Sequence, residues 1–210
     1  TLCILAPTPN QTMIDDDMSL LVGGKPFFPI GVYHVPPADM PGVAELGMNT
    51  VQVWSWDGVG AVDKANSLGL KVLMEFANIS PNMIREWAPK LKEHPGLMAW
   101  YGRDEPYEAD FDFAKSLSDT FHQCDANHPT YMVSCTPRLF PQHAQLADIM
   151  AVDPYPYPSA PLTAVSEHAD LAWKATLGEK PVWQVVQSFG GEPEAQQRCM
   201  TYLAVVHQAM

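Results

Sequence analysis

Short apolar runs alternate with helix-like segments from about residue 26 onward. Their apolar residues are consecutive, as in 71–77 (KVLMEFA) and 130–135 (TYMVSC), and do not occupy only every second position. Such runs are typical of strands buried on both faces, as in parallel sheets. Strands are therefore predicted at residues 26–34, 50–54, 71–77, 96–102, 130–135, 149–152 and 181–186.

A helical pattern follows each predicted strand. Gly69 ends the second helix as a C-cap glycine, and Pro81 stands in the first turn of the third. The helices are predicted at residues 40–46, 59–68, 81–93, 111–124, 141–147, 162–177 and 194–209. Repeated βα units favour a TIM (β/α)8 barrel over a doubly wound sheet. No glycine-rich phosphate loop follows the first strand, which argues against a nucleotide-binding fold.

The N-terminal part and the eighth unit depart from a complete barrel. Residues 13–28 predict a β-hairpin with turns at Asp16–Asp17 and Gly23–Gly24, placed at the barrel bottom. We expect residues 1–25 to form an N-terminal segment with this hairpin, and residues 26–210 to form the barrel domain. No eighth strand precedes Met210, so the barrel is expected to lack that strand or to be truncated before it. An incomplete barrel exposes strand edges, which predicts self-association.

Composition excludes several classes of function. The chain has 210 residues, is 47% hydrophobic and carries a net charge of −12, which argues against nucleic-acid partners and anionic membranes. No segment is long and apolar enough to span a bilayer. Residues 2–7 (LCILAP) fit the end of a signal peptide or lipoprotein leader, hence a secreted or periplasmic protein, or an arbitrary edge of the sequence. Neither CxxC, HxH nor HxxxH occurs, so no metal or other cofactor is expected.

The candidate chemistry lies where the predicted strands end. Asp104, Glu105 and Pro106 directly follow the buried run 97–100, and two adjacent carboxylates there suggest a carboxylate-based active site. Barrel active sites lie at the carboxyl ends of the strands. The polar and aromatic side chains expected there are His34, Trp54, Trp56, Asp57, Glu75, Asn78, Arg103, Asp104, Glu105, Arg138, Asp153, Tyr155 and Gln187. This mixture is typical of sugar sites, where aromatic rings stack on pyranoses and polar groups bind hydroxyls.

Three stretches resemble clan A glycoside hydrolases, which are retaining enzymes. Residues 20–33 are similar to their hairpin and first strand, and residues 45–51 to their approach to the second strand. Asp104-Glu105-Pro106 resembles their Asn-Glu-Pro motif, in which the Glu is the general acid/base. The resemblance implies that role for Glu105. It also implies a nucleophilic Glu at the end of the seventh strand, where this chain has Gln187, or Gln184 in another register.

The sequence thus predicts a glycoside hydrolase acting on an oligo- or polysaccharide. Glu105 is the expected proton donor; Asp153, and after it Asp104, is favoured as the second carboxylate over Glu75. The expected sugar-binding residues are Trp54, Trp56, Glu75, Arg103, Tyr155, Gln187 and His34. Structural roles are the alternatives: Asp153 capping a turn, Glu75 paired with Arg103, and His34 bound to a loop backbone. A barrel that binds carbohydrate without cleaving it, or another hydrolase on the same fold, are the alternative functions.

Overall fold

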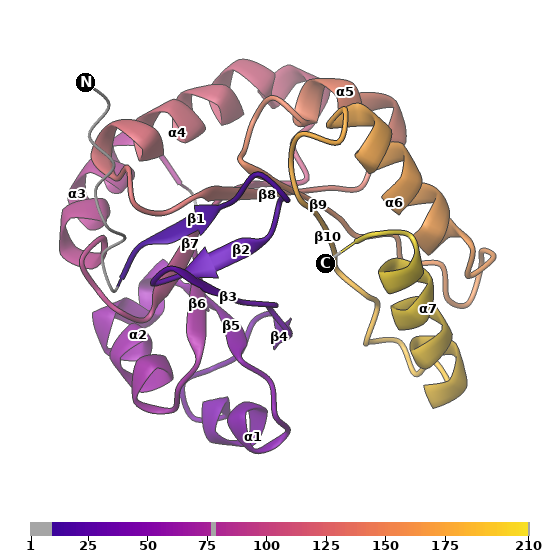
Figure 1. The fold of residues 1–210 in the computed structure, drawn as a ribbon, viewed down its shortest axis with the longest axis horizontal. Helices are drawn as coiled ribbons and strands as arrows, with labels where there is room; N and C mark the ends of the chain where they lie inside the picture. The colour runs from indigo at the N-terminus through magenta and orange to yellow at the C-terminus, as the bar shows by residue number, and fades with distance from the viewer. Residues whose placement is uncertain (1–9, 77–78, 210) are drawn as a thin grey trace. The chain divides into compact units, whose positions relative to one another are not determined.

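The structure is a computed structural model that describes residues 10–76 and 79–209 (Figure 1). A strand or helix overlaps each predicted range, although several are shorter than predicted, the first parallel strand most of all. The parallel strands are β4 (Gly31–Val32), β5 (Thr50–Trp54), β6 (Lys71–Glu75), β7 (Leu97–Asp104), β8 (Thr130–Ser134), β9 (Ile149–Val152) and β10 (Val182–Gln184). The helices are α1 (Met40–Glu45), α2 (Gly58–Ser67), α3 (Pro81–Leu91), α4 (Phe111–Cys124), α5 (Phe140–His143), α6 (Ala164–Ala175) and α7 (Glu194–Val206). The leader-like residues 2–7 and Asn78 lie outside the described residues.

The parallel strands form one open sheet with the order β10-β9-β8-β7-β6-β5-β4. Within residues 10–76 and 79–209, β4 and β10 end this order and no eighth strand joins them. The predicted TIM (β/α)8 barrel, complete or truncated, is therefore wrong, although the α/β character holds. The first predicted strand also shrinks to Gly31–Val32, because Lys25–Pro26 pair with β2 instead and Pro29 has no N–H to offer.

The described chain divides into two compact units. Unit 1 comprises the residues up to Gly102 together with Leu117–Thr130, and unit 2 comprises Arg103–Ser116 and the residues from Tyr131 onward. The domain boundary expected at residues 25 and 26 stays a prediction.

Strand β5 shows how the core of unit 1 is built. Val51 and Val53 are fully buried against the apolar faces of α1, α2 and α3. Gln52 points to the opposite face and is also buried. The strand is therefore covered on both faces, as its continuous apolar run predicts. An amide in this position needs hydrogen-bond partners, which the site described below supplies.

The N-terminal residues of unit 1 form a three-stranded antiparallel sheet, not a single hairpin. Strands β1 (Thr12–Ile14), β2 (Leu20–Val22) and β3 (Lys25–Pro26) are joined by turns at the predicted positions. Gly23 and Gly24 both have positive φ, which a tight hairpin turn of this kind requires. The Thr12 N–H donates to the Asn127 carbonyl at 2.9 Å, which anchors β1 to the segment after α4. The sheet does not close into a barrel, so the predicted placement of the N-terminal hairpin at a barrel bottom is also wrong.

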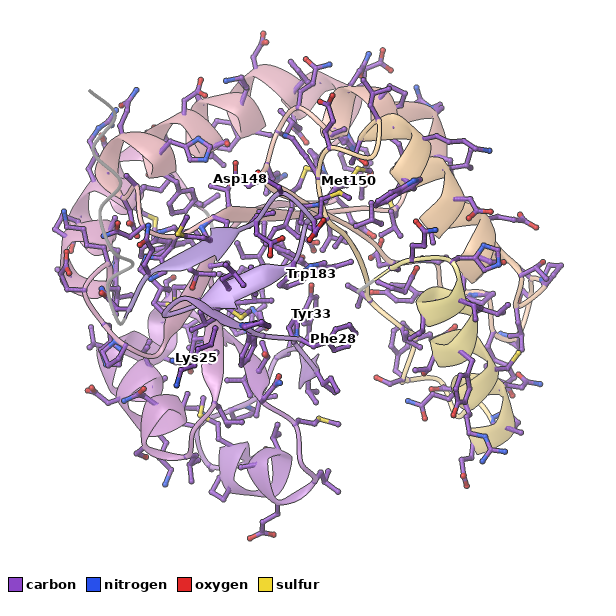
Figure 2. All side chains as sticks on the ribbon, viewed as in Figure 1. Lys25, Phe28, Tyr33, Asp148, Met150 and Trp183 are labelled. Carbon is purple, nitrogen blue, oxygen red and sulfur yellow. The ribbon has the colours of Figure 1, made fainter. Side chains whose placement is uncertain are left out.

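Unit 2 has its own core, between strands β9 and β10 and helices α6 and α7. Met150 and Val152 on β9 pack against buried residues of α6, which also contacts α7 (Figure 1). Successive side chains of a strand alternate between faces, so Ala151 points away from this core and Asp153, just beyond the strand, continues on the side of Ala151. Figure 2 labels Met150 on β9 and Trp183 on β10; Trp183 is the strand partner of Ala151. In the described part of the chain, no helix is long and apolar enough to cross a membrane.

Candidate active site

Unit 2 brings three carboxyl groups together at the carboxyl ends of its strands. Asp104 ends β7, Glu105 follows it, and Asp153 follows β9. Glu105 has φ +38°, a conformation that L residues seldom adopt, and its N–H donates to the Val133 carbonyl of β8 at 3.1 Å. Such a backbone persists where the surrounding structure enforces it, often at functional sites. The backbone conformation at Glu105 therefore fixes the direction in which its side chain leaves the backbone.

Asp153 and Glu105 form a hydrogen-bonded carboxyl pair. Asp153 is 5% exposed, and its burial, followed by the hydrogen bond to Glu105 and the charge of Glu105, raises its pKa to about 8. The charge of Asp104 acts in the same direction, whereas a hydrogen bond from the Tyr155 hydroxyl opposes the shift. At neutral pH Asp153 therefore keeps its proton, and its carboxyl group is hydrogen-bonded to Glu105. A buried carboxyl group with a strongly raised pKa is a common property of catalytic acids.

Tyr155 and Cys135 border this pair. Burial, and then the charge of Asp153, raise the pKa of the Tyr155 hydroxyl, so this group stays protonated. The Tyr155 ring meets the Phe189 ring edge-on, with centroids 4.8 Å apart. Burial likewise raises the pKa of the Cys135 thiol, and the nearby Glu105 and Asp153 add to the shift. A thiol kept protonated is a poor nucleophile.

Gln187 ties two loops of unit 2 together. Its Oε1 accepts from the Tyr157 N–H at 3.0 Å, and its Nε2 donates to the carbonyls of Tyr157 at 3.1 Å and Phe189 at 3.2 Å. The side chain is 2% exposed. Gln187 thus links the loop that follows β9, which carries Tyr155, to the loop that carries Phe189. Its predicted role in binding sugar stays a prediction, because these backbone groups already occupy the amide.

The two arginines near the cluster are paired with acids. Arg103 Nη2 lies 3.6 Å from Asp110 Oδ2, and Arg138 Nη1 lies 3.0 Å from Glu108 Oε2. The second pair is largely exposed, so it contributes little to stability.

The remaining predicted residues gather at strand ends in unit 1. Trp54 and Trp56 stack with ring centroids 4.4 Å apart and an interplanar angle of 13°. Trp54 ends strand β5, and Trp56 lies in the 3-10 turn η1 (Ser55–Asp57) that follows it. His34 meets Trp54 edge-on, with centroids 4.8 Å apart. Trp56 is 63% exposed, so its ring is accessible to a bound molecule.

A buried hydrogen-bond chain supports the aromatic group. The His34 N–H donates to Gln52 Oε1 at 2.6 Å, and Gln52 Nε2 donates to Glu75 Oε2. His34 has φ +56°, so this contact holds an unusual backbone conformation. This hydrogen bond joins the His34 backbone to a side chain, and the alternative of a His34 side chain bound to a loop backbone stays a prediction.

The predicted residues therefore fall into two groups. Unit 2 holds Arg103, Asp104, Glu105, Asp153, Tyr155 and Gln187, and unit 1 holds His34, Trp54, Trp56 and Glu75. Sequence reasoning missed Cys135, Phe189 and Gln52. Gln52 carried a signal, since it is an amide inside the buried run 50–54. Among residues 10–76 and 79–209, no group of three His, Cys, Asp or Glu side chains is arranged to hold a metal ion.

No protein-family model matches this sequence, and no curated protein sequence does. Solved structures match its fold. A β-D-glucuronidase of Dictyoglomus thermophilum has a TM-score of 0.66 at 14% identity, over 94% of this chain and 44% of its own. A β-glucuronidase 2 of Bacteroides uniformis has a TM-score of 0.70 at 14% identity, over 94% of this chain and 31% of its own. A GH2 β-galacturonidase of Eisenbergiella tayi has a TM-score of 0.70 at 15% identity, over 88% of this chain and 40% of its own.

This chain spans less than half the length of each of these three proteins. Identity this low shows a shared fold. The three structural neighbours are glycoside hydrolases, which agrees with the class of enzyme that the sequence resembles.

Proposed function

We propose that this chain is a glycoside hydrolase acting on an oligo- or polysaccharide, with Glu105 as general acid/base and Asp153 as the second carboxylate. The observation that carries the proposal is the hydrogen-bonded pair of carboxyl groups, of which Asp153 stays protonated at neutral pH. Glycoside hydrolysis requires one protonated and one ionised carboxyl group. Asp153 is the protonated member of this pair, and the fold of the structural neighbours is consistent with the assignment.

The proton must reach the leaving oxygen through Glu105. In the structure Asp153 is hydrogen-bonded to Glu105, so a proton shift along that bond leaves Glu105 protonated and Asp153 ionised. Catalytic carboxyl groups are about 5–5.5 Å apart in retaining enzymes and about 6.5–9.5 Å apart in inverting ones. A direct hydrogen bond is shorter than either separation. We therefore propose that the bound glycoside separates the pair and takes the place of the direct bond.

Sugar binding is assigned to the polar and aromatic side chains at the strand ends. In unit 2, Tyr155 and Arg103 border the carboxyl pair. Unit 1 by itself carries a separate aromatic group, formed by His34, Trp54 and Trp56, on which a pyranose can stack; Glu75 supports this group through Gln52. The exposed ring of Trp56 is the element of this group best placed to meet a sugar.

A second candidate function is carbohydrate binding without cleavage. It is favoured by one observation: the place in which the resembling family has its nucleophile holds Gln187, whose amide is engaged with backbone groups. An amide cannot form the glycosyl-enzyme ester. In this case the carboxyl pair would bind hydroxyl groups and would not transfer a proton.

Aryl glycosides with leaving groups of different basicity separate the two candidates. A poor leaving group such as phenol needs protonation, whereas dinitrophenolate leaves without it. Glu105→Gln should therefore lower kcat/KM for phenyl glycosides by about 100- to 10,000-fold, and for dinitrophenyl glycosides much less. The control Glu179→Gln removes an exposed carboxylate outside the cluster and should behave as wild type.

Two outcomes contradict the proposal, the first for the role of Glu105 and the second for the hydrolase itself. If Glu105→Gln cleaves phenyl glycosides at the wild-type rate, Glu105 is not the acid. If wild type cleaves none of these substrates but binds oligosaccharides in calorimetry, the binding function is correct.

A further inference from the structure

The segments at the carboxyl ends of the unit 2 strands are strongly acidic. These segments are residues 103–110, 135–139, 153–163 and 185–193, which follow or end β7, β8, β9 and β10. They contain no Lys and only two Arg, Arg103 and Arg138. Their acidic residues are Asp104, Glu105, Glu108, Asp110, Asp153 and Glu192. Negative charge remains in excess even while Asp153 keeps its proton.

Both arginines already face a carboxylate. Asp110 lies 3.6 Å from Arg103, and Glu108 lies 3.0 Å from Arg138. An anionic ligand that used either guanidinium would have to compete with that carboxylate.

Of the buried side-chain polar atoms of unit 2 without a protein partner, which include Arg103 Nε, two lie on the face that leads to the carboxyl pair. They are Asp153 Oδ1 and Trp183 Nε1, on residues that are each 5% exposed. Trp183 pairs with Ala151, so strand alternation places both residues on the face opposite the helical core. Buried polar atoms without a partner cost free energy, and a bound ligand can remove that cost. A neutral carboxyl group and an indole N–H suit an uncharged hydroxyl group.

We propose that the sugar bound at this carboxyl cluster is uncharged or carries an amine, and that uronic acids and sulfated sugars are rejected. The inference rests on the proposed function, since it concerns the same cluster. It departs from the substrates named for the structural neighbours, which are glucuronidases and a galacturonidase. An acidic sugar would meet an excess of negative charge and would compete with Asp110 and Glu108 for the two guanidinium groups, whereas an amino sugar would meet opposite charge.

The test measures binding, so that it does not depend on turnover. Saturation-transfer NMR and calorimetry are carried out with three matched ligands, methyl glucoside, methyl glucosaminide and methyl glucuronide, and with the galacto series. The glucuronide should bind at least about tenfold more weakly than the glucoside, and the glucosaminide at least as tightly. High salt should reduce both differences because it screens charges. Asp104→Asn should narrow the gap between glucoside and glucuronide, while Glu179→Gln should leave it unchanged.

The same ligands as aryl glycosides keep this inference distinct from the proposed function. Discrimination in binding without hydrolysis of any substrate supports the inference and refutes the hydrolase. Preferential hydrolysis of the glucuronide supports the hydrolase and overturns the inference. Equal or tighter binding of the uronide, or no binding of any of these sugars, also overturns it.

Discussion

Gln187→Glu is the most informative single substitution, because it changes an amide to the carboxylate that the resembling family has at this place. The wild-type amide accepts one hydrogen bond from the Tyr157 N–H and donates two, to the carbonyls of Tyr157 and Phe189. A glutamate keeps the accepted bond. As a carboxylate it can donate neither of the others, and as a protonated acid it can donate only one.

The cost follows from these contacts. Each lost bond in a site that is 2% exposed contributes about 1 kcal/mol, and an ionised group facing two carbonyl oxygens adds a desolvation cost. We expect a loss of about 3 kcal/mol at neutral pH and about 1 kcal/mol in acid, where only one donated bond is missing. The sign follows from burial, which raises the folded-state pKa of a glutamate above its unfolded value. The variant is therefore most stable below the unfolded pKa of about 4.3 and loses stability as pH rises through the folded-state pKa.

Urea unfolding at pH about 4 and about 7 measures this difference. Gln145→Glu is the matched control, because Gln145 also donates to a carbonyl but is exposed, and its change should stay within about 0.5 kcal/mol. The reasoning is refuted if Gln187→Glu is as stable as wild type at neutral pH. Because Gln187 links the loops that carry Tyr155 and Phe189, we also expect Gln187→Glu to lose activity and not to gain a working nucleophile.

Three further predictions follow from particular contacts. The pKa of Asp153 is raised to about 8, so its contribution to stability is complete below its unfolded pKa and is lost as pH rises through about 8. Asp153→Asn should remove this pH dependence of the unfolding free energy, as measured by urea unfolding at several pH values. An unchanged pH profile would contradict the assignment. Gly31→Ala places a Cβ 2.5 Å from the Thr50 carbonyl oxygen and should destabilise the fold by about 2–4 kcal/mol in thermal unfolding. The control Gly42→Ala, whose Cβ would have nothing within 4 Å, should stabilise α1 slightly. Equal unfolding midpoints for the two variants would refute the steric account. Strands β4 and β10 end the parallel sheet, and unpaired edges favour pairing between copies, so sedimentation velocity should show concentration-dependent association; a single monomer peak at all concentrations would argue against it.

Local pattern was sufficient to predict the elements. The run 71–77 is apolar without interruption, and strand β6 occupies Lys71–Glu75 within it. Gly69 ends the preceding helix segment with φ +76°, which is the conformation that the C-cap prediction requires. Such features depend on neighbours in sequence, so they can be recognised without knowing the fold.

Closure of the sheet could not be predicted from the same pattern. Every βα unit has similar periodicity whether its sheet closes or stays open, because periodicity reports burial and not the partner of an edge strand. The first strand shows why: residues 25–26 pair with β2, and only Gly31–Val32 remain to pair with β5. The choice between these partners depends on contacts far apart in sequence.

The sequence by itself determined the parallel strands and helices and the placing of Glu105 and Asp153 at strand ends, because these follow from hydrophobic periodicity and turn residues. Only the tertiary structure decided that the sheet stays open, that Asp153 is buried beside Glu105, and that Gln187 links two loops. The physical reason is that burial and hydrogen bonding depend on residues that the fold brings together. The pKa of Asp153 and the partners of an amide are properties of that assembled environment.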